Sequence, residues 1–447
     1  MSVLDASIAN VALPTIGREL RADPAASIWV VNAFQIAVTV TLLPLAALGD
    51  AIGYRKLFSR GIILFTAGSL ACALSHSLGA LVAARVLQGF GASAIMSVGP
   101  ALYRTIFPSA KLGQALGISA FVVASSASAG PTIGGAILAV LPWPWLFALN
   151  VPIGIADALL APRALPRRTG RGGRVDIVSA LLSAGALGLF VLGLDGFAHP
   201  VPRWQIAALL AAAFAFGAAF IERQRRVSNP VLPLDLFGSS RFSLATATSF
   251  CSFVAQGLAY VSLPFLFQEV LGFSPLASGL LFTPWPIAIA LMAPIAGALA
   301  DRYPPQALAT AGLTVFACGL EAMALLPSHA GVANIVWRAV LCGIGFGFFQ
   351  SPNNREIMGS VPRERSGSAS GVLATVRVTG QTVGAALVAI ALGTAGATLV
   401  AHAANATLTA SAHAAIARSV HATLAFAGAA AAAAAAVSAL RLRKSGP

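Results

Sequence analysis

The sequence predicts an all-α membrane protein of fourteen spans, built as two six-helix bundles related by an internal repeat with two additional helices between them. The composition, the number of long apolar stretches and a pattern shared by the two halves predict this fold class. Of the 447 residues, 57% are hydrophobic and 9% are charged, whereas about 25% are charged in an ordinary soluble domain. The mean hydropathy is +0.84. Because so few charges cannot cover the surface of a water-soluble chain of this length, we expect the protein to lie in a lipid bilayer.

The apolar stretches have about the length of membrane spans, for which a helix needs about 20 apolar residues. Proline, glycine and charged residues separate them. The expected spans are 1–17, 28–49, 59–76, 79–103, 113–140, 143–161, 176–196, 204–221, 242–270, 276–299, 306–326, 333–351, 367–396 and 419–440.

The first span is short. Its acid, Asp5, lies roughly 20 Å inward from Arg18, at ~1.5 Å per residue, just past the middle of a ~30 Å core. About seven further residues would be needed to reach the surface at that spacing, and four precede Asp5. We therefore expect that the chain around Asp5 is cut short on its N-terminal side.

The positive charges are distributed unevenly between the connecting segments. If the N-terminus is cytoplasmic, 21 of the 28 Lys and Arg residues fall in cytoplasmic segments, four in external segments and three inside spans. Because cytoplasmic loops collect Lys and Arg, we expect a multi-pass protein of a bacterial cytoplasmic (inner) membrane with both termini in the cytoplasm. This placement also explains the net charge of +14. Without a basic stripe interleaved with aromatic residues, we expect no nucleic-acid partner.

A sequence pattern occurs in both halves of the chain. PSAKLGQALG (108–117) and PRERSGSASG (362–371) share P-x4-G-x-A-x-G at an offset of 254 residues. Upstream, RVLQGFG and RAVLCGIGFG repeat at nearly the same offset, and the loop acid Asp50 matches Asp301. The expected parts are a first six-helix bundle (1–161), basic linkers with two additional helices (162–241), a second six-helix bundle (242–440) and a cytoplasmic tail (441–447).

Duplicated bundles in a bilayer favour a transporter over a membrane-bound enzyme, because such repeats hold a site at their interface and rock against each other. The sequence contains no P-loop, metal-binding cluster or hydrolytic triad, so we expect neither catalysis nor ATP-driven transport, and no metal or cofactor. The four cysteines stand singly in apolar stretches, which indicates neither a zinc site nor a disulfide framework.

Three of the charged side chains inside apolar stretches are candidates for a functional role. They are Asp5 in LDASIANVALP, Arg85 in RVLQGFGAS and Glu321 in LTVFACGLEAMALL. A charge at the centre of a span costs about 2.5 to 3.5 kcal/mol on insertion scales, so each is a functional hypothesis. Two other interpretations stay open: Asp5 as an N-terminal helix acid at the membrane interface, and Arg85 as a purely structural buried arginine.

Further polar residues inside the spans could contact a substrate or could bond neighbouring helices. These residues are Asn10, Gln35, Gln88, Gln256, Arg377 and Gln381.

A tight loop is expected in ALGDAIGYRK, where Gly53 permits the turn and Asp50 can cap a helix or pair with Arg55 or Lys56. Asp301 and Arg302 stand in the matching loop of the second half. The open alternative is a basic loop that only sets the topology.

Small residues recur every four positions in SASAGPTIGG. Ser126, Gly130 and Gly134 would form a flat face that lets another helix approach closely, and Pro131, followed by Gly134 and Gly135, would kink this helix. At the offset of 254 the second half keeps only Gly384. Such a face usually indicates helix packing, so we expect a close seam between the bundles.

Together and in this order, the motifs resemble those of the major facilitator superfamily, specifically its fourteen-span drug:proton antiporters. WPWLFALNVPIG and GFGFFQSPNNREIMGSVP are similar to further motifs of that group, and in the latter Asn353 and Asn354 are expected to cap helix ends. The sequence departs from the group in the loop motif, where Ala46 replaces a Gly and Ala51 an Arg, and in the aromatic motif, where Pro144 replaces a common Arg.

The resemblance implies roles for these motifs. The loop with Asp50 latches the bundles on the cytoplasmic side, the segment from Gly130 to Gly135 is typical of exporters, and Arg85 takes part in proton coupling. Asp5 with Arg85 is the first candidate pair for coupling, and Glu321 is the second candidate site.

The expected function is therefore proton-coupled export of hydrophobic or amphipathic small molecules by alternating access, with cationic compounds among the candidates. The expected partners are the lipid bilayer, the substrate and protons, the proton gradient replaces any cofactor, and a monomer is sufficient. Two alternatives stay open: a dedicated exporter of a single metabolite, and a transport-dead sensor or scaffold if the first helix is incomplete.

Overall fold

The computed structural model describes residues 1–447 except 107–108, 167–175, 199–200, 228–231, 233, 301, 328–329, 362–365, 402–407 and 444–447. Some side chains within helices, including that of Asp50, also lie outside the described part. In the first part of the chain the helices are α1 (Ser2–Glu19), α2 (Pro24–Ser27), α3 (Trp29–Ile52), α4 (Tyr54–Ala73), α5 (Leu78–Ile106), α6 (Ser109–Val140), α7 (Pro144–Ala148) and α8 (Asn150–Ala164).

The middle and last parts of the chain are also helical. They contain α9 (Ile177–Asp195), η1 (Gly196–Ala198), α10 (Arg203–Arg226), η2 (Leu234–Gly238), α11 (Ser240–Phe265), η3 (Leu266–Val270), α12 (Pro275–Phe282), α13 (Pro284–Leu299), α14 (Pro305–Ala324), α15 (Val332–Gly359), α16 (Ser366–Ala401) and α17 (Leu408–Arg443).

The predicted all-α membrane fold is confirmed. Among the described residues, twelve helical stretches are long and apolar enough to cross a membrane. With α1 and α6, they stand at the fourteen positions expected from the sequence. Several helices run past the charges that were taken as their limits: α4 begins at Tyr54, before Arg55, Lys56 and Arg60. Long basic side chains allow this, because they reach from a helix end to the polar interface.

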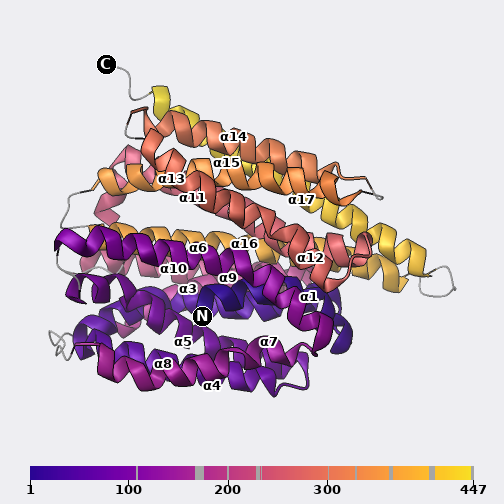
Figure 1. Cartoon of the computed structure of the whole chain (residues 1–447), viewed down its shortest axis with the longest axis horizontal. Helices are drawn as coiled ribbons and strands as arrows, with labels where there is room; N and C mark the ends of the chain where they lie inside the picture. Colours follow the sequence, from indigo (N-terminus) through magenta and orange to yellow (C-terminus); the bar gives the residue numbers. More distant parts are fainter. Residues whose placement is uncertain are drawn as a thin grey trace.

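The long helices run roughly side by side, with the first half of the chain in the lower part of Figure 1 and the second half in the upper part. α1 starts part way along the bundle (Figure 1). We call the end of the bundle that holds the α3–α4 loop with Arg55 and Lys56 the basic end, and the end that holds α2, α7 and η3 the opposite end.

Glycine contacts show that the halves share one packing scheme. A Cβ at Gly91 in α5 would lie 2.8 Å from the Gly61 carbonyl oxygen in α4, and a Cβ at Gly345 in α15 would lie 2.8 Å from the Gly312 carbonyl oxygen in α14. Because both pairs leave no room for a side chain, α4–α5 and α14–α15 cross in contact at equivalent points. Gly68 packs on Gln88 in the first half as Gly319 packs on Cys342 in the second.

The glycine face of α6 also has a fuller counterpart than the sequence offset indicated. Gly130 and Gly134 pack on Leu4 and Ile8 of α1, and Gly380 and Gly384 pack on α11 in the same way. The prediction that only Gly384 is kept was wrong, because the offset between these two helices is 250 residues rather than 254. Gln381 therefore stands where the first half has Pro131.

The additional helices α9 and α10 form a hairpin, and α9 packs against both α3 and α16. Asp176 caps α9 through Ser179 N–H, and its Oδ1 accepts a hydrogen bond of 2.9 Å from Arg223 at the end of α10. This hydrogen bond lowers the pKa of Asp176 to about 2. Since the pKa of Asp176 is depressed in the folded state, the contribution of this pair to the free energy of unfolding is fully present above the ordinary carboxyl pKa. It is lost only as the pH falls toward 2.

Candidate functional site

A buried ion pair joins α1 to α5. Arg85 Nη1 donates a hydrogen bond of 2.5 Å to Asp5 Oδ2, and the two side chains are 0% and 1% exposed. The other carboxylate oxygen, Oδ1, accepts from Gln88 Nε2 at 2.9 Å and from Asn150 Nδ2 of α8 at 2.7 Å. Three donors from two helices therefore hold one carboxylate of α1 in a site that bulk water does not reach.

The guanidinium of Arg85 is fixed from several sides. Its Nε donates to the Val30 carbonyl at 2.8 Å, and its Nη1 also donates to Gln88 Oε1 at 2.5 Å. Its Cζ lies 4.2 Å from the ring centroid of Phe34 and 5.5 Å from that of Phe147. Nη2 is buried and has no hydrogen-bond partner among the described residues. The pair therefore leaves one donor that a rearranged state could use.

Among the described residues, the Asp5–Arg85 pair has no counterpart at the equivalent position of the second half. Where Gln88 packs on Gly68, the second half has Cys342 on Gly319, and the same register puts Ala339 at the position of Arg85. The expected counterpart, Arg338, is one residue out of register. It donates instead to the Ala322 carbonyl at 2.8 Å and stacks on Trp337.

A cavity of about 690 Å³ lies between the two halves, and α1, α3, α11 and α16 are among its walls. Five of the six polar residues predicted for a substrate path line it, namely Asn10, Gln35, Gln256, Arg377 and Gln381. The sixth, Gln88, belongs to the buried pair instead. Phe34 also lines the cavity, and the Arg85 guanidinium packs on its ring.

The cavity extends toward the basic end, because Pro294 and Asn354, close to the ends of α13 and α15, contribute to its wall. Asn354 therefore faces the cavity and Asn353 lies inside α15, whereas both were expected to cap helix ends. The expectation failed because α15 continues through Pro352 to Gly359.

Contacts between the halves close the cavity at the opposite end. Gln268 Nε2 in the π-helix η3 donates to the Val11 carbonyl of α1 at 2.8 Å, and Arg18 Nε lies 3.5 Å from Glu269 Oε1. The sequence analysis missed Gln268, although a polar residue after Pro264 in an apolar stretch and near the end of a span is a usable signal.

The predicted close seam lies beside these contacts. A Cβ at Gly135 of α6 would lie 2.6 Å from the Pro275 carbonyl oxygen of α12, and Gly279 of α12 packs directly on the Pro131 carbonyl. The hydroxyl oxygens of Thr132 and Thr283 lie 2.6 Å apart across the same seam. The glycine face of α6 thus packs on α1 and on the other half of the molecule at once.

Glu321 belongs neither to the buried Asp5–Arg85 pair nor to the cavity wall. Its side chain is exposed on α14, beside Gly428 of α17, and it does not line the cavity.

The loop motif is described only in part. Gly53 has φ of +98°, a conformation that favours glycine, and it divides α3 from α4. Arg55 is half-buried, and Lys56 and Arg302 are exposed. The side chain of Asp50 and the whole of Asp301 lie outside the described part, so the predicted latch stays a prediction.

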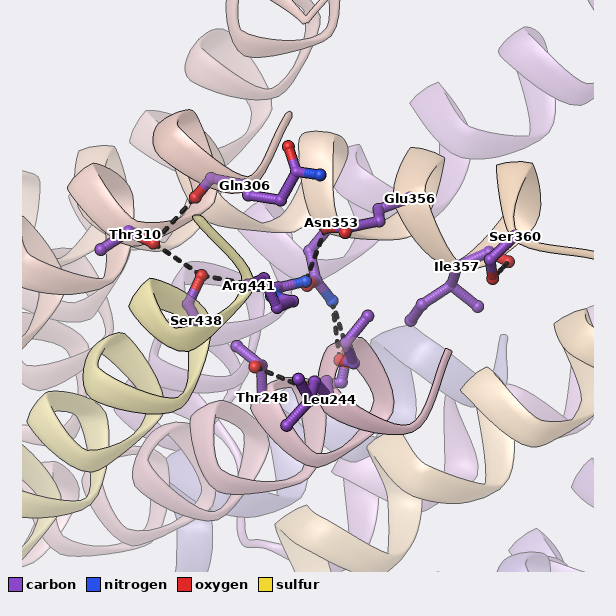
Figure 2. A network of polar contacts seen from close by, with 12 residues as sticks. Leu244, Thr248, Gln306, Thr310, Asn353, Glu356, Ile357, Ser360, Ser438 and Arg441 are labelled. Atoms are coloured by element: carbon purple, nitrogen blue, oxygen red, sulfur yellow. Dashed lines mark hydrogen bonds and ion pairs between the residues drawn. The ribbon is translucent and has the colours of Figure 1, made fainter. Parts of the chain in front are cut away.

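A second buried ion pair, which the sequence analysis missed, lies near the basic end of the second half (Figure 2). Arg441 Nη1 donates to Glu356 Oε2 at 2.7 Å and to Asn353 Oδ1 at 2.9 Å, and Nη2 donates to Ser438 Oγ at 2.6 Å. The prediction of a tail from residue 441 was wrong, because α17 continues to Arg443 and buries Arg441 against α15.

We expect Glu356→Met to lower the free energy of unfolding by about 3 kcal/mol or more, because it leaves Arg441 buried without its counterion. Glu222→Met removes an exposed pair with Arg226, which are 51% and 76% exposed, and is expected to cost about 1 kcal/mol or less. Thermal unfolding of the purified protein in detergent measures both changes. Equal losses in the two variants would contradict the structural role of the Arg441–Glu356 pair.

Two related helical halves, a cavity between them and a closure at one end define a membrane transporter rather than an enzyme. The family model described as Major Facilitator Superfamily matches residues 1–385. The chain belongs to this superfamily and is a multi-pass transmembrane transporter.

Three relatives show which proteins are similar to this chain in sequence. The chain is 52% identical over 394 residues to the "Uncharacterized transporter YebQ" of Escherichia coli K12, covering 88% of this chain and 86% of that one. It is 33% identical over 379 residues to the "Riboflavin transporter RibZ" of Clostridioides difficile, covering 84% and 82%. It is 33% identical over 395 residues to the "Multidrug resistance protein Stp" of Mycobacterium tuberculosis, covering 87% and 72%.

A solved structure has the same fold. The inward-facing, unoccupied form of a bacterial homologue of the human lysosomal transporter Spinster superposes with a TM-score of 0.71 at 17% identity, covering 99% of this chain and 95% of that one.

Proposed function

We propose that this protein is a proton-coupled antiporter that exports amphipathic small molecules across the bacterial cytoplasmic membrane, with both termini in the cytoplasm. One observation carries the proposal: an acid and a basic residue, Asp5 and Arg85, form a buried pair, and Phe34, against which Arg85 packs, lines the central cavity. Buried charges of this kind in membrane proteins mark ion and proton pathways. The name of the relative Stp supports efflux of drug-like molecules.

The geometry supplies a route from protonation to movement. α1 carries Asp5 on one side and lines the cavity with Ala6, Ser7 and Asn10 on another. Farther along, its Val11 carbonyl and Arg18 contact the other half through Gln268 and Glu269. Protonating Asp5 would remove the charge that Arg85, Gln88 and Asn150 hold, so α1 would be released from α5 and α8.

In the proposed cycle, the closed contacts at the opposite end exist while Asp5 is ionised and paired. When these contacts open, a proton that enters from outside neutralises Asp5. This changes the relative stability of the two states, because the ionised form has its strong partners in the closed one. Substrate and proton then compete for the protein through the position of α1, without sharing a binding site.

A flux assay in proteoliposomes tests this function. Purified protein is reconstituted with a trapped pH dye, and a panel of amphipathic dyes and drugs is added under an imposed pH gradient. We expect substrate movement that follows the gradient and stops when an ionophore collapses it. Flux of every transported compound at the same rate with and without the gradient would contradict the proposal.

The relative RibZ favours a second candidate, a dedicated exporter of one metabolite, because its name assigns it a single vitamin. The same panel separates the candidates: several unrelated compounds would move in the first case and one compound in the second.

A further inference from the structure

The central cavity has an unusual charge balance. Among its described lining residues the only charged side chain is Arg377 of α16, and none is a carboxylate. The buried acid Asp5 does not line the cavity and is already paired with Arg85. An organic cation would therefore be repelled by the positive charge of Arg377, and no carboxylate on the wall would offset this repulsion. An organic anion would be attracted by the same charge and would meet no carboxylate that repels it.

Arg377 has no ion pair and no hydrogen bond to any residue of the described part. Its neighbour along the cavity wall is Tyr260, which is an uncharged phenol at neutral pH. An arginine inside a membrane protein ordinarily pairs with an acid or with backbone carbonyls, because an unpaired charge in this medium is costly. A ligand that supplies the missing anion would satisfy it, and the planar guanidinium matches a carboxylate through two parallel hydrogen bonds.

A second, independent observation points to a ligand in the same cavity. Asn10 of α1 is 8% exposed, lines the cavity, and its Oδ1 has no hydrogen-bond partner among the described residues. Buried amide oxygens in proteins are almost always bonded. Asn10 therefore provides an unused acceptor on the cavity wall, suited to a hydroxyl or amine group of a bound molecule.

The remaining wall fits an aromatic body. Phe34 from the first half and Phe253, Tyr260 and Phe346 from the second half all line the cavity. Gln381 Nε2 donates to Gln256 Oε1 at 3.0 Å, so these two amides form a fixed polar strip beside Arg377. A volume of about 690 Å³ falls within the range of small-molecule sites, about 300 to 1,000 Å³.

We propose that the substrates of this transporter are amphipathic organic anions, with an aromatic or polycyclic body and one carboxylate or similarly acidic group, and that Arg377 is the residue that binds the anionic group. This rests on the proposed function, since it names the substrate class of the same cavity. It also replaces the expectation that cations are among the candidates.

Three probes with one body separate the charge from the shape: 9-anthracenecarboxylate, 9-anthracenemethanol and 9-(aminomethyl)anthracene, which are anionic, neutral and cationic at pH 7. Their fluorescence reports binding to the full-length protein in nanodiscs of zwitterionic lipid, with empty nanodiscs as the blank. We expect the wild-type protein to bind the carboxylate at least about tenfold more tightly than the amine, about 1.4 kcal/mol. Equal affinities, or a preference for the amine, would overturn the proposal without any variant being needed.

Variants then assign the preference to one residue. We expect Arg377→Gln to weaken binding of the carboxylate by about tenfold or more, to change that of the neutral alcohol less than about twofold, and to be largely rescued by Arg377→Lys. Arg338→Gln is the matched control, because it removes an arginine from another span of the same half that does not line the cavity. Unchanged carboxylate binding in Arg377→Gln, or an equal loss in Arg338→Gln, would contradict the assignment.

The binding assay stands apart from the flux assay. Charge-selective binding that depends on Arg377, found together with gradient-independent flux, would keep this inference and overturn proton coupling. Gradient-dependent flux, found together with equal binding of the carboxylate and the amine, would keep proton coupling and overturn the substrate class.

Discussion

Replacing Asp5 with Asn should reduce transport driven by a pH gradient to the rate of empty vesicles, while exchange of labelled for unlabelled substrate without a gradient continues. Asn keeps the shape of the side chain and can still accept hydrogen bonds from Gln88 and Asn150, but it cannot take up a proton. Counterflow and gradient-driven uptake in the same vesicles measure the two activities.

The matched control is Asp157→Asn, the same chemical change at a half-buried acid of α8 that is outside the pair. It should leave both activities near wild type. Because Asp5→Asn leaves Arg85 buried without its counterion, a loss of stability is also expected. The double variant Asp5→Asn with Arg85→Gln removes both charges and should recover stability without recovering coupling. Wild-type pH dependence of transport in Asp5→Asn or in the double variant would remove Asp5 from the mechanism.

Substituting Val for Gly279 should block closure at the opposite end and stop transport, with the protein still inserted in the membrane. A Cβ at this position would overlap with the Pro131 carbonyl oxygen of α6, and Val adds two methyl groups to it. Overpacking a tight contact costs about 1 to 3 kcal/mol, enough to change the balance between two conformations that differ by a few kcal/mol.

Cross-linking measures this closure directly. Thr132→Cys and Thr283→Cys replace hydroxyls that lie 2.6 Å apart, so a disulfide between them forms only when α6 and α12 are in contact. We expect a high yield in the otherwise unchanged protein and a low yield with Gly279→Val. Gly188→Val in α9 is the control, because a Cβ there meets no atom within 4 Å. A cross-linking yield and a flux that Gly279→Val leaves unchanged would refute the role of this seam.

The sequence predicted the spans and the partnership of Asp5 with Arg85 for physical reasons that are local. Apolar length identifies a membrane helix, and charges inside one usually face the bundle interior, where they pair with other charges or with backbone carbonyls. The same reasoning made Glu321 the second candidate, yet Glu321 is exposed beside Gly428. An acid in an apolar stretch does not show which side of its helix it occupies, because that depends on how neighbouring helices pack.

The sequence also does not show whether a charged residue near the end of a helix belongs to a solvated tail or to a buried pair. Arg441, the first of three basic residues in RLRK, reads as the start of a tail, but it pairs with Glu356, 85 residues earlier. Such a pairing involves two helices whose relative rotation is set by the whole second half. The sequence offers only the two charges, and neither is near the other along the chain.

Gln88 and Cys342 occupy equivalent positions of the two halves but differ in chemistry, and this difference has a consequence for evolution. A gene that doubled would at first have carried the same side chains in both copies. Here the Asp5–Arg85 pair stands in the first copy and Ala339 takes the place of Arg85 in the second, while α11 and α16 of the second supply Arg377, Gln381, Gln256 and Tyr260 to the cavity wall. Substitutions in the second copy can therefore alter the cavity wall without touching the Asp5–Arg85 pair, which we propose couples transport to the gradient. Such independence would let one ancestral chain give rise to descendants as different as a vitamin carrier and a resistance pump.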